Sequence, residues 1–223
     1  MTKTTHRTER RADALSKERI VEAAMAILDA GGESALTFRA LAARLATGSG
    51  AIYWHVADKN ELLAAATEAV IARVMTQVDS GAEPREAIRV IALALFDAID
   101  AHPWVGTQFS RAPWQSPLLR IFEGIGGRLQ ALGVPEQALF DTWSALVNYI
   151  LGVAGQNAAN ARLAPPDTDR SAFLAAVAAQ WAQLDPVEYP FLRQVAEPLR
   201  VHDDREQFLA GIDLILAGIA TIR

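Results

Sequence analysis

Apolar side chains recur along most of the chain at the three- and four-residue spacing of α-helices, and no segment alternates as a half-buried strand does. A first helix is expected between Ser16, which can cap it, and the pair Gly31-Gly32, which can end it. One face of this helix is apolar and should be buried, and it consists of Ile20, Ala24, Ile27 and Leu28.

Two short helices should follow over residues 38–45 and 49–56, with a tight turn at residues 46–48 between them. Thr37 can cap the first of the two. Ile52 and Val56 are four residues apart, so they share one side of the second short helix and should face a core. Three helices of this kind, with a tight turn before the third, are typical of a helix-turn-helix.

A longer helix is predicted over residues 58–78, because Asp58 and Glu61 form a capping box at its start. Further along the chain, prolines stand directly before apolar-periodic runs, as they do in the first turn of helices, at Pro84, Pro103, Pro117 and Pro135. More helices are expected over residues 135–163, 169–184 and 203–222, with a short helix ending at Leu199 before the last of them.

The pattern therefore predicts an all-α fold with a flexible basic tail (1–15), a helix-turn-helix domain (16–62) and a larger helical domain (63–223). A hydrophobic content of 51% and a charged content of 21% are typical of a chain that folds. The N-terminus has no apolar signal segment, and the apolar C-terminal run is short and interrupted by Asp213. A cytoplasmic protein without a membrane span is expected.

The net charge of −5 is unevenly distributed. Residues 1–19 carry more Lys and Arg than acidic residues, whereas residues 63–223 carry an excess of Asp and Glu. DNA binding depends on a local basic patch, so an acidic body does not exclude it. The basic start is either a solvated tail or an arm that contacts DNA. The chain has no cysteine and its four histidines are scattered, so neither a metal site nor a cofactor is expected.

The predicted third helix begins with the small side chains of Ser49, Gly50 and Ala51, which would let it approach base edges in the major groove. Polar-tipped rings follow, and these can pack against the sugar-phosphate backbone while donating to phosphates: Tyr53, Trp54 and His55. On spacing alone, Tyr53 and Trp54 are equally compatible with the core of an ordinary helical bundle.

Residues 36–42 (Leu-Thr-Phe-Arg-Ala-Leu-Ala) and residues 51–63, with the run Tyr-Trp-His-Val, resemble the N-terminal domain of the tetracycline repressor (TetR) family. The resemblance covers residues 16–63, and the Tyr-Trp-His-Val form is similar to the tetracycline repressors themselves.

This resemblance implies a set of DNA-contacting residues. Arg39 matches an arginine that reads a guanine, and the matches to phosphate-contacting positions are Thr37, Tyr53, Trp54 and Lys59. Thr47 and His55 lie in the same stretch and are further candidates. The small residues Ser49, Gly50 and Ala51 depart from the larger residues of tetracycline repressors, which leaves the operator sequence open.

The resemblance also implies a homodimer joined by a bundle of two long helices from each subunit, and a small-molecule pocket in the body. The predicted helices 135–163 and 203–222 are apolar around much of their circumference, as a dimer requires, although an unusually apolar monomer core is an alternative. The candidate pocket residues are Met75, Ile91, His102, Trp104, Phe109, Trp114, Phe122, Ile125, Trp143 and Asn148.

Three of these positions are apolar where tetracycline repressors contact the drug with polar side chains, namely Met75, Ile91 and Ile125. Only His102 stands where those repressors have a metal-ligand histidine. Burying polar atoms of the drug against apolar side chains is unfavourable, so no response to magnesium-tetracycline is expected. The same substitutions favour a fairly apolar effector.

Together these features predict a DNA-binding transcriptional regulator, a dimeric repressor that a small molecule releases from a palindromic operator. A ligand-independent regulator or activator is one alternative, and an all-α enzyme is another. The enzyme has little support, because the chain shows no nucleophile–base signature, no Glu-x-x-His pair and no Gly-rich phosphate loop.

Overall fold

A computed structural model describes residues 15–77, 81–111, 116–163 and 169–222, and over these ranges the chain is all-α with no strand, as predicted. The predicted tail up to residue 14 and Trp114 lie outside the described residues. The helices are α2 (Lys17–Ala35), α3 (Phe38–Arg44), α4 (Ser49–Tyr53), α5 (Lys59–Thr76), α6 (Pro84–Ala101), α7 (Pro103–Arg111), α8 (Ser116–Ala131), α9 (Glu136–Leu163), α10 (Arg170–Ala182), α11 (Pro190–Arg200) and α12 (Asp204–Ile219).

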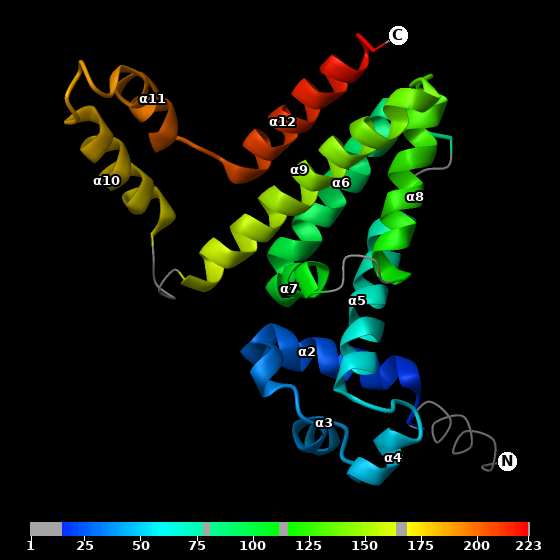
Figure 1. The fold of residues 1–223 in the computed structure, drawn as a ribbon. Helices are drawn as coiled ribbons and strands as arrows, with labels where there is room; N and C mark the ends of the chain where they lie inside the picture. The colour runs from blue at the N-terminus through cyan, green and yellow to red at the C-terminus, as the bar shows by residue number, and fades with distance from the viewer. Residues whose placement is uncertain (1–14, 78–80, 112–115, 164–168, 223) are drawn as a thin grey trace, which may run out of the picture.

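Helices α2, α3 and α4 form a small unit at one end of the molecule, which we call the head (Figure 1). One residue from each helix is fully buried in its core: Ile20, Leu41 and Ile52. Helix α4 ends at Tyr53 and is therefore shorter than predicted. Val56 lies in the turn that follows, yet it is buried as its spacing from Ile52 predicted.

The ends of α2 and α3 are defined by capping and by one glycine. Ser16 and Thr37 cap these helices as predicted, because each side-chain oxygen accepts a hydrogen bond from the backbone N–H three residues later. Gly32 adopts a φ of 67°, a left-handed conformation that favours glycine, and it breaks α2 as predicted. A short continuation to Ala35 precedes α3.

Helix α5 starts in the head and continues into the rest of the chain, which we call the body. Asp58 caps α5 by accepting from the Glu61 N–H at 2.8 Å, and the Glu61 carboxylate accepts from the Ala57 N–H at 2.8 Å. The same carboxylate pairs with Lys17 at the start of α2, with 2.8 Å between the two charged atoms. The predicted domain boundary between residues 62 and 63 falls inside α5.

Helix α6 lies in the middle of the body and packs against α5, α7, α8, α9 and α12. Its central apolar residues, Ile88, Ile91, Leu95 and Ile99, are buried. Pro84 and Pro103 are the first residues of α6 and α7. Both helices therefore begin where the prolines predicted, because proline needs no N–H partner in a first helical turn.

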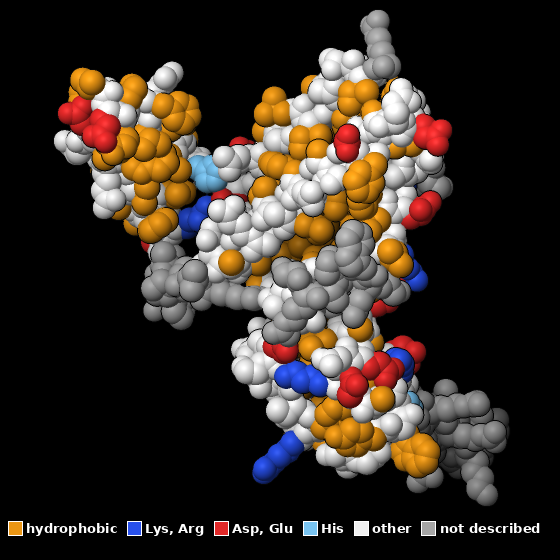
Figure 2. Space-filling model, in the orientation of Figure 1, with side chains coloured by type: hydrophobic (Ala, Val, Ile, Leu, Met, Phe, Trp, Pro, Cys, Tyr) orange, Lys and Arg blue, Asp and Glu red, His pale blue; other side chains and the backbone are white. Residues whose placement is uncertain are grey.

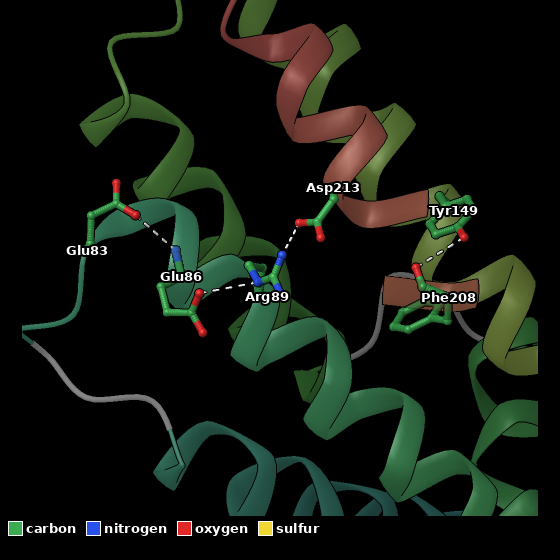
Figure 3. Close-up of polar contacts among 6 residues, drawn as sticks. All are labelled: Glu83, Glu86, Arg89, Tyr149, Phe208 and Asp213. Atoms are coloured by element: carbon green, nitrogen blue, oxygen red, sulfur yellow. Dashed lines mark hydrogen bonds and ion pairs between the residues drawn. The ribbon is translucent and has the colours of Figure 1, made fainter. Parts of the chain in front are cut away.

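Polar contacts and stacked rings hold the last helix against α6 and α9 (Figure 3). Arg89 of α6 pairs with Asp213 of α12 and with Glu86, and the hydrogen bond to Asp213 raises the pKa of the arginine. Tyr149 of α9 donates its hydroxyl proton to the Phe208 carbonyl oxygen at 3.2 Å and stacks on the Phe208 ring. These contacts fix α12 along the body.

Helices α10 and α11 pack against each other as a hairpin that stands apart from the body in Figure 1. Apolar side chains gather on this hairpin in Figure 2, and Phe173, Val187 and Phe191 are exposed. Arg170 at the start of α10 pairs with Asp204 at the start of α12, with 2.5 Å between the charged atoms. The hairpin is thereby tied to the body at its base.

Candidate DNA-reading head and effector region

Helix α4 presents its leading end to solvent. Ser49 and Gly50 are exposed and Ala51 is half-buried, whereas Ile52 behind them is fully buried. The apolar side of α4 thus anchors the helix in the head while its small leading residues face outward. This is the geometry that a helix needs in order to enter the major groove with its N-terminal end.

The aromatic residues at the end of α4 are not part of the head's core. Trp54 is 89% exposed and Tyr53 is 55% exposed. The Tyr53 ring stacks on Phe38 of α3, with 4.3 Å between ring centroids and 5° between planes. The alternative in which both rings fill a helical bundle is therefore excluded, and both polar tips are available to phosphates.

The remaining candidates are placed around the same surface. Arg39 is exposed in the first turn of α3, and Thr37 is exposed with its hydroxyl oxygen accepting the capping hydrogen bond. Thr47 and His55 are half-buried. The Lys59 ammonium donates to the Glu33 carbonyl oxygen at 2.6 Å, which uses one of its three N–H donors. Lys59 therefore ties α5 to the end of α2 in this structure.

Two candidate pocket residues, Met75 and Ile91, meet on the seam between α5, α6 and α8. A Cβ built at Gly124 of α8 would lie 2.9 Å from Met75 Cε and 3.5 Å from Ile91 Cδ1. Ile125, the next residue of α8, is fully buried. The apolar side chains of Met75 and Ile91 thus converge on the bare backbone of Gly124. This glycine could not be singled out from the sequence, because its surroundings depend on residues from two other helices.

Charged residues that the sequence did not single out lie along the same α5–α8 seam. Glu68 of α5 pairs with Arg120 of α8 at 3.1 Å between Oε1 and Nε. Arg128 donates to the Gly124 carbonyl oxygen at 2.8 Å. Among the described residues, Glu68 Oε2 and Arg128 Nε are buried without a hydrogen-bond partner. Buried polar atoms of this kind are costly, and a ligand's polar group would satisfy them.

Other candidate pocket residues lie away from the seam between α5, α6 and α8. Phe122 and Trp143 form an edge-to-face pair between α8 and α9, with ring centroids 5.0 Å apart. Phe109 is buried on α7. Asn148 is exposed on α9 and donates to the Ser144 hydroxyl, so the structure does not bring it together with Met75 and Ile91.

His102 and Trp104 face the head. The His102 ring lies with Nδ1 2.8 Å from Asp29 Oδ1, and the Trp104 indole N–H donates to the same oxygen at 2.7 Å. Asp29 belongs to α2. A cavity of about 430 Å³ lies beside these contacts, between α2 and α7, and its lining includes Leu28, Gly32 and Thr107.

No group of three or more potential metal ligands occurs among the described residues. Within the same ranges, no helix combines the length and the apolar character needed to cross a membrane.

The fold and the exposed α4 define a helix-turn-helix DNA-binding protein. Residues 20–66 match the family model described as bacterial regulatory proteins of the tetR family, and residues 79–223 match that of the tetracyclin repressor-like C-terminal domain. The chain therefore belongs to the TetR family of transcriptional regulators. It is a DNA-binding regulator and not an enzyme, as predicted.

Known relatives support this assignment. The solved structure of the TetR regulator SCO7222 from Streptomyces coelicolor is 53% identical, covers 94% of this chain and 99% of its own, and has a TM-score of 0.86. An HTH-type transcriptional regulator of Saccharopolyspora erythraea is 32% identical over 139 residues, which are 62% of this chain and 59% of that relative. The HTH-type transcriptional repressor DrrR1 of Streptomyces coeruleorubidus is 26% identical over 93% of this chain and 78% of its own length.

Proposed function

We propose that this regulator is a homodimeric repressor in the cytoplasm, which binds an inverted-repeat operator and is released by a small, fairly apolar effector. One observation carries the DNA-binding part: α4 is anchored by Ile52 and exposes Ser49 and Gly50. The name of the relative DrrR1 favours repression over activation. We assign the operator contacts to Thr37, Arg39, Thr47, Ser49, Gly50, Ala51, Tyr53, Trp54, His55 and Lys59.

The outer faces of α9 and α12 support the dimer. A Cβ added at Gly152 or Gly218 would meet no atom within 4 Å, so packing within the chain does not require a glycine at either position. Leu214 of α12 is 75% exposed. Glycines on a helix surface permit close approach of a second helix, and an exposed leucine gains by burial. A second copy seated on α9 and α12 would use both features.

A symmetric dimer carries two α4 helices, and two reading helices require half-sites about one turn of B-DNA apart, roughly 34–36 Å. Footprinting should therefore show an operator with two-fold symmetry. Sedimentation at micromolar concentration should show a dimer. A monomer at that concentration, or a footprint without symmetry, would contradict the proposal.

The convergence of Met75 and Ile91 on Gly124 supports an apolar effector, with Glu68 and Arg128 available for its few polar groups. Phe122 and Trp143, which pair between α8 and α9, are proposed as a wider lining of this site. Release requires an effector that prefers the DNA-incompetent state. A ligand-independent regulator would lack such a response.

Two titrations test the effector. N-phenyl-1-naphthylamine, an uncharged apolar fluorophore, should bind saturably and weaken operator binding, whereas magnesium-tetracycline should do neither at micromolar concentration. Gly124→Leu should block the fluorophore, because even a Cβ there would lie 2.9 Å from Met75 Cε, so the larger side chain must displace Met75 and crowd Ile91. The matched control is Gly127→Leu, since a Cβ at Gly127 meets nothing within 4 Å. Equal binding by both variants would refute this location of the effector.

A further inference from the structure

One carboxylate oxygen of the head, in α2, contacts two side chains at the α6–α7 junction of the body. Asp29 Oδ1 accepts a hydrogen bond from the Trp104 indole at 2.7 Å and lies 2.8 Å from His102 Nδ1. His102 is the C-cap of α6, and Trp104 is the second residue of α7. Trp104 is only 4% exposed, so its buried N–H depends on Asp29 as its partner.

Asp29 lies beside an open space between the head and the body, and a second side-chain contact near this space joins Gln108 of α7 to Glu33 of α2 at 3.4 Å. The cavity of about 430 Å³ between α2 and α7 is lined by Leu28, Asp29, Gly32, Glu33, Pro103, Trp104 and Thr107. The facing surfaces of the two helices are therefore not continuously packed at this place. A polar contact beside an open cavity controls the angle between two helices more than the same contact inside a close-packed seam.

Helix α6 connects this contact to the effector region. Ile91, which lies against Gly124, and His102 belong to the same helix and are eleven residues apart, about 16 Å along its axis. A rigid helix that is displaced near Ile91 moves its C-terminal end, and that end carries the partner of Asp29. Ile91 and His102 were both expected from the sequence to line the pocket. In the structure, His102 instead faces Asp29 of the head.

We propose that Asp29 is a positioning residue: through His102 and Trp104 it sets the orientation of the DNA-reading head on the body. The contact holds the two heads of a dimer at the spacing that the operator requires, and a shift of the α6–α7 junction changes that spacing. This role rests on the proposed dimeric repressor for its effect on operators. The orientation within one chain does not depend on the dimer.

The first test compares Asp29→Ala with Glu22→Ala on a full operator and on a single half-site. Glu22 is an exposed acid on the same helix, and no hydrogen bond or ion pair of its side chain occurs among the described residues. Asp29→Ala should weaken full-operator binding by about tenfold or more and leave half-site binding unchanged within about twofold. Glu22→Ala should change both affinities by the same small factor. Equal losses on the two DNAs for Asp29→Ala would overturn the positioning role.

The second test measures orientation within one chain and needs no DNA. The chain has no cysteine, so a double variant with Ala43→Cys on α3 and Gln130→Cys on α8 takes up spin labels at these two positions alone. The distance between the two labels reports how the head is oriented on the body. The labelled protein is diluted with unlabelled chain so that only distances within a chain contribute. Asp29→Ala should broaden or shift the distance distribution while helix content stays unchanged, and an unaltered distribution would refute the proposal. His102→Gln should act in the same direction and replaces Asp29→Ala if that variant does not fold.

Discussion

Phe38 and Tyr53 stack with ring centroids 4.3 Å apart and planes inclined by 5°. The pair joins the start of α3 to the end of α4, across the turn of the helix-turn-helix. Arg39 follows Phe38 directly and is exposed, so the stack fixes the helix turn from which Arg39 projects. The reading surface therefore depends on contacts between its two helices and not on α4 alone.

Arg39→Ala should weaken operator binding by about 1–3 kcal/mol and relax the preference at one base pair of each half-site. The expected loss reflects a bidentate contact between Arg39 and a guanine of the operator. Random DNA does not consistently place a guanine opposite Arg39, so binding to random DNA should change less. Competition binding with operator and random DNA measures it. Arg44→Ala removes the same charge from the other end of α3 and should weaken binding to both DNAs alike. An equal loss on both DNAs for Arg39→Ala would rule out base reading.

Gly152→Arg should give a folded monomer that no longer binds the operator tightly. Space is open around Gly152 within one chain, so the arginine does not disturb the monomer, but it would be forced into the proposed dimer seam. Gly127→Arg is the matched control, because Gly127 is also open and lies on α8. Sedimentation and circular dichroism provide the measurements. A Gly152→Arg protein that stays dimeric would place the dimer elsewhere.

Glu61→Gln should flatten the acid dependence of stability. The hydrogen bond from the Ala57 N–H, and then Lys17, lower the pKa of Glu61 from its ordinary value of 4.5. A depressed folded-state pKa stabilises the fold above the ordinary value, and this contribution is lost as pH falls through the folded-state value. The stability difference between wild type and Glu61→Gln should thus be present at neutral pH and shrink in acid. Urea unfolding across this range measures it, with Glu22→Gln as the control.

Gly211→Ala should destabilise the body by about 1–3 kcal/mol, the usual cost of overpacking. A Cβ at Gly211 would lie 1.9 Å from the Tyr149 hydroxyl oxygen and 2.3 Å from its Cζ. Tyr149 is fixed by its stack on Phe208, so it does not yield easily. Gly127→Ala should instead stabilise by up to about 1 kcal/mol, since alanine favours helix and the site is open. Thermal unfolding that ranks the two variants the other way would contradict this packing.

Much of the fold could be predicted from local signals. Caps at Ser16 and Thr37, the break at Gly32 and the prolines that begin α6 and α7 act through the backbone of their own segment, so the sequence reports them directly. The length of α4 could not be predicted, because Val56 keeps its buried place in a turn as well as it would in a helix.

The candidate sites were harder to predict, because they depend on which distant segments meet. Periodicity cannot show that His102 reaches Asp29, which is 73 residues away, or that Lys59 donates to the Glu33 carbonyl. A helix junction such as His102 also has no regular face from which its direction could be inferred. The resemblance named Met75 and Ile91 as candidates one by one, but only the packed helices show that both lie against the bare Gly124.

Nothing lies within 4 Å of the position that a Cβ would take at Gly48 or Gly50, and both glycines are exposed. Side chains can therefore appear at these two positions without disturbing Ile52 or the rest of the head. On the proposal that the start of α4 contacts the operator, mutations there would alter what the protein recognises while its folding stays intact. A gene duplicate of this regulator would then acquire a new operator in few evolutionary steps, with its body inherited unchanged.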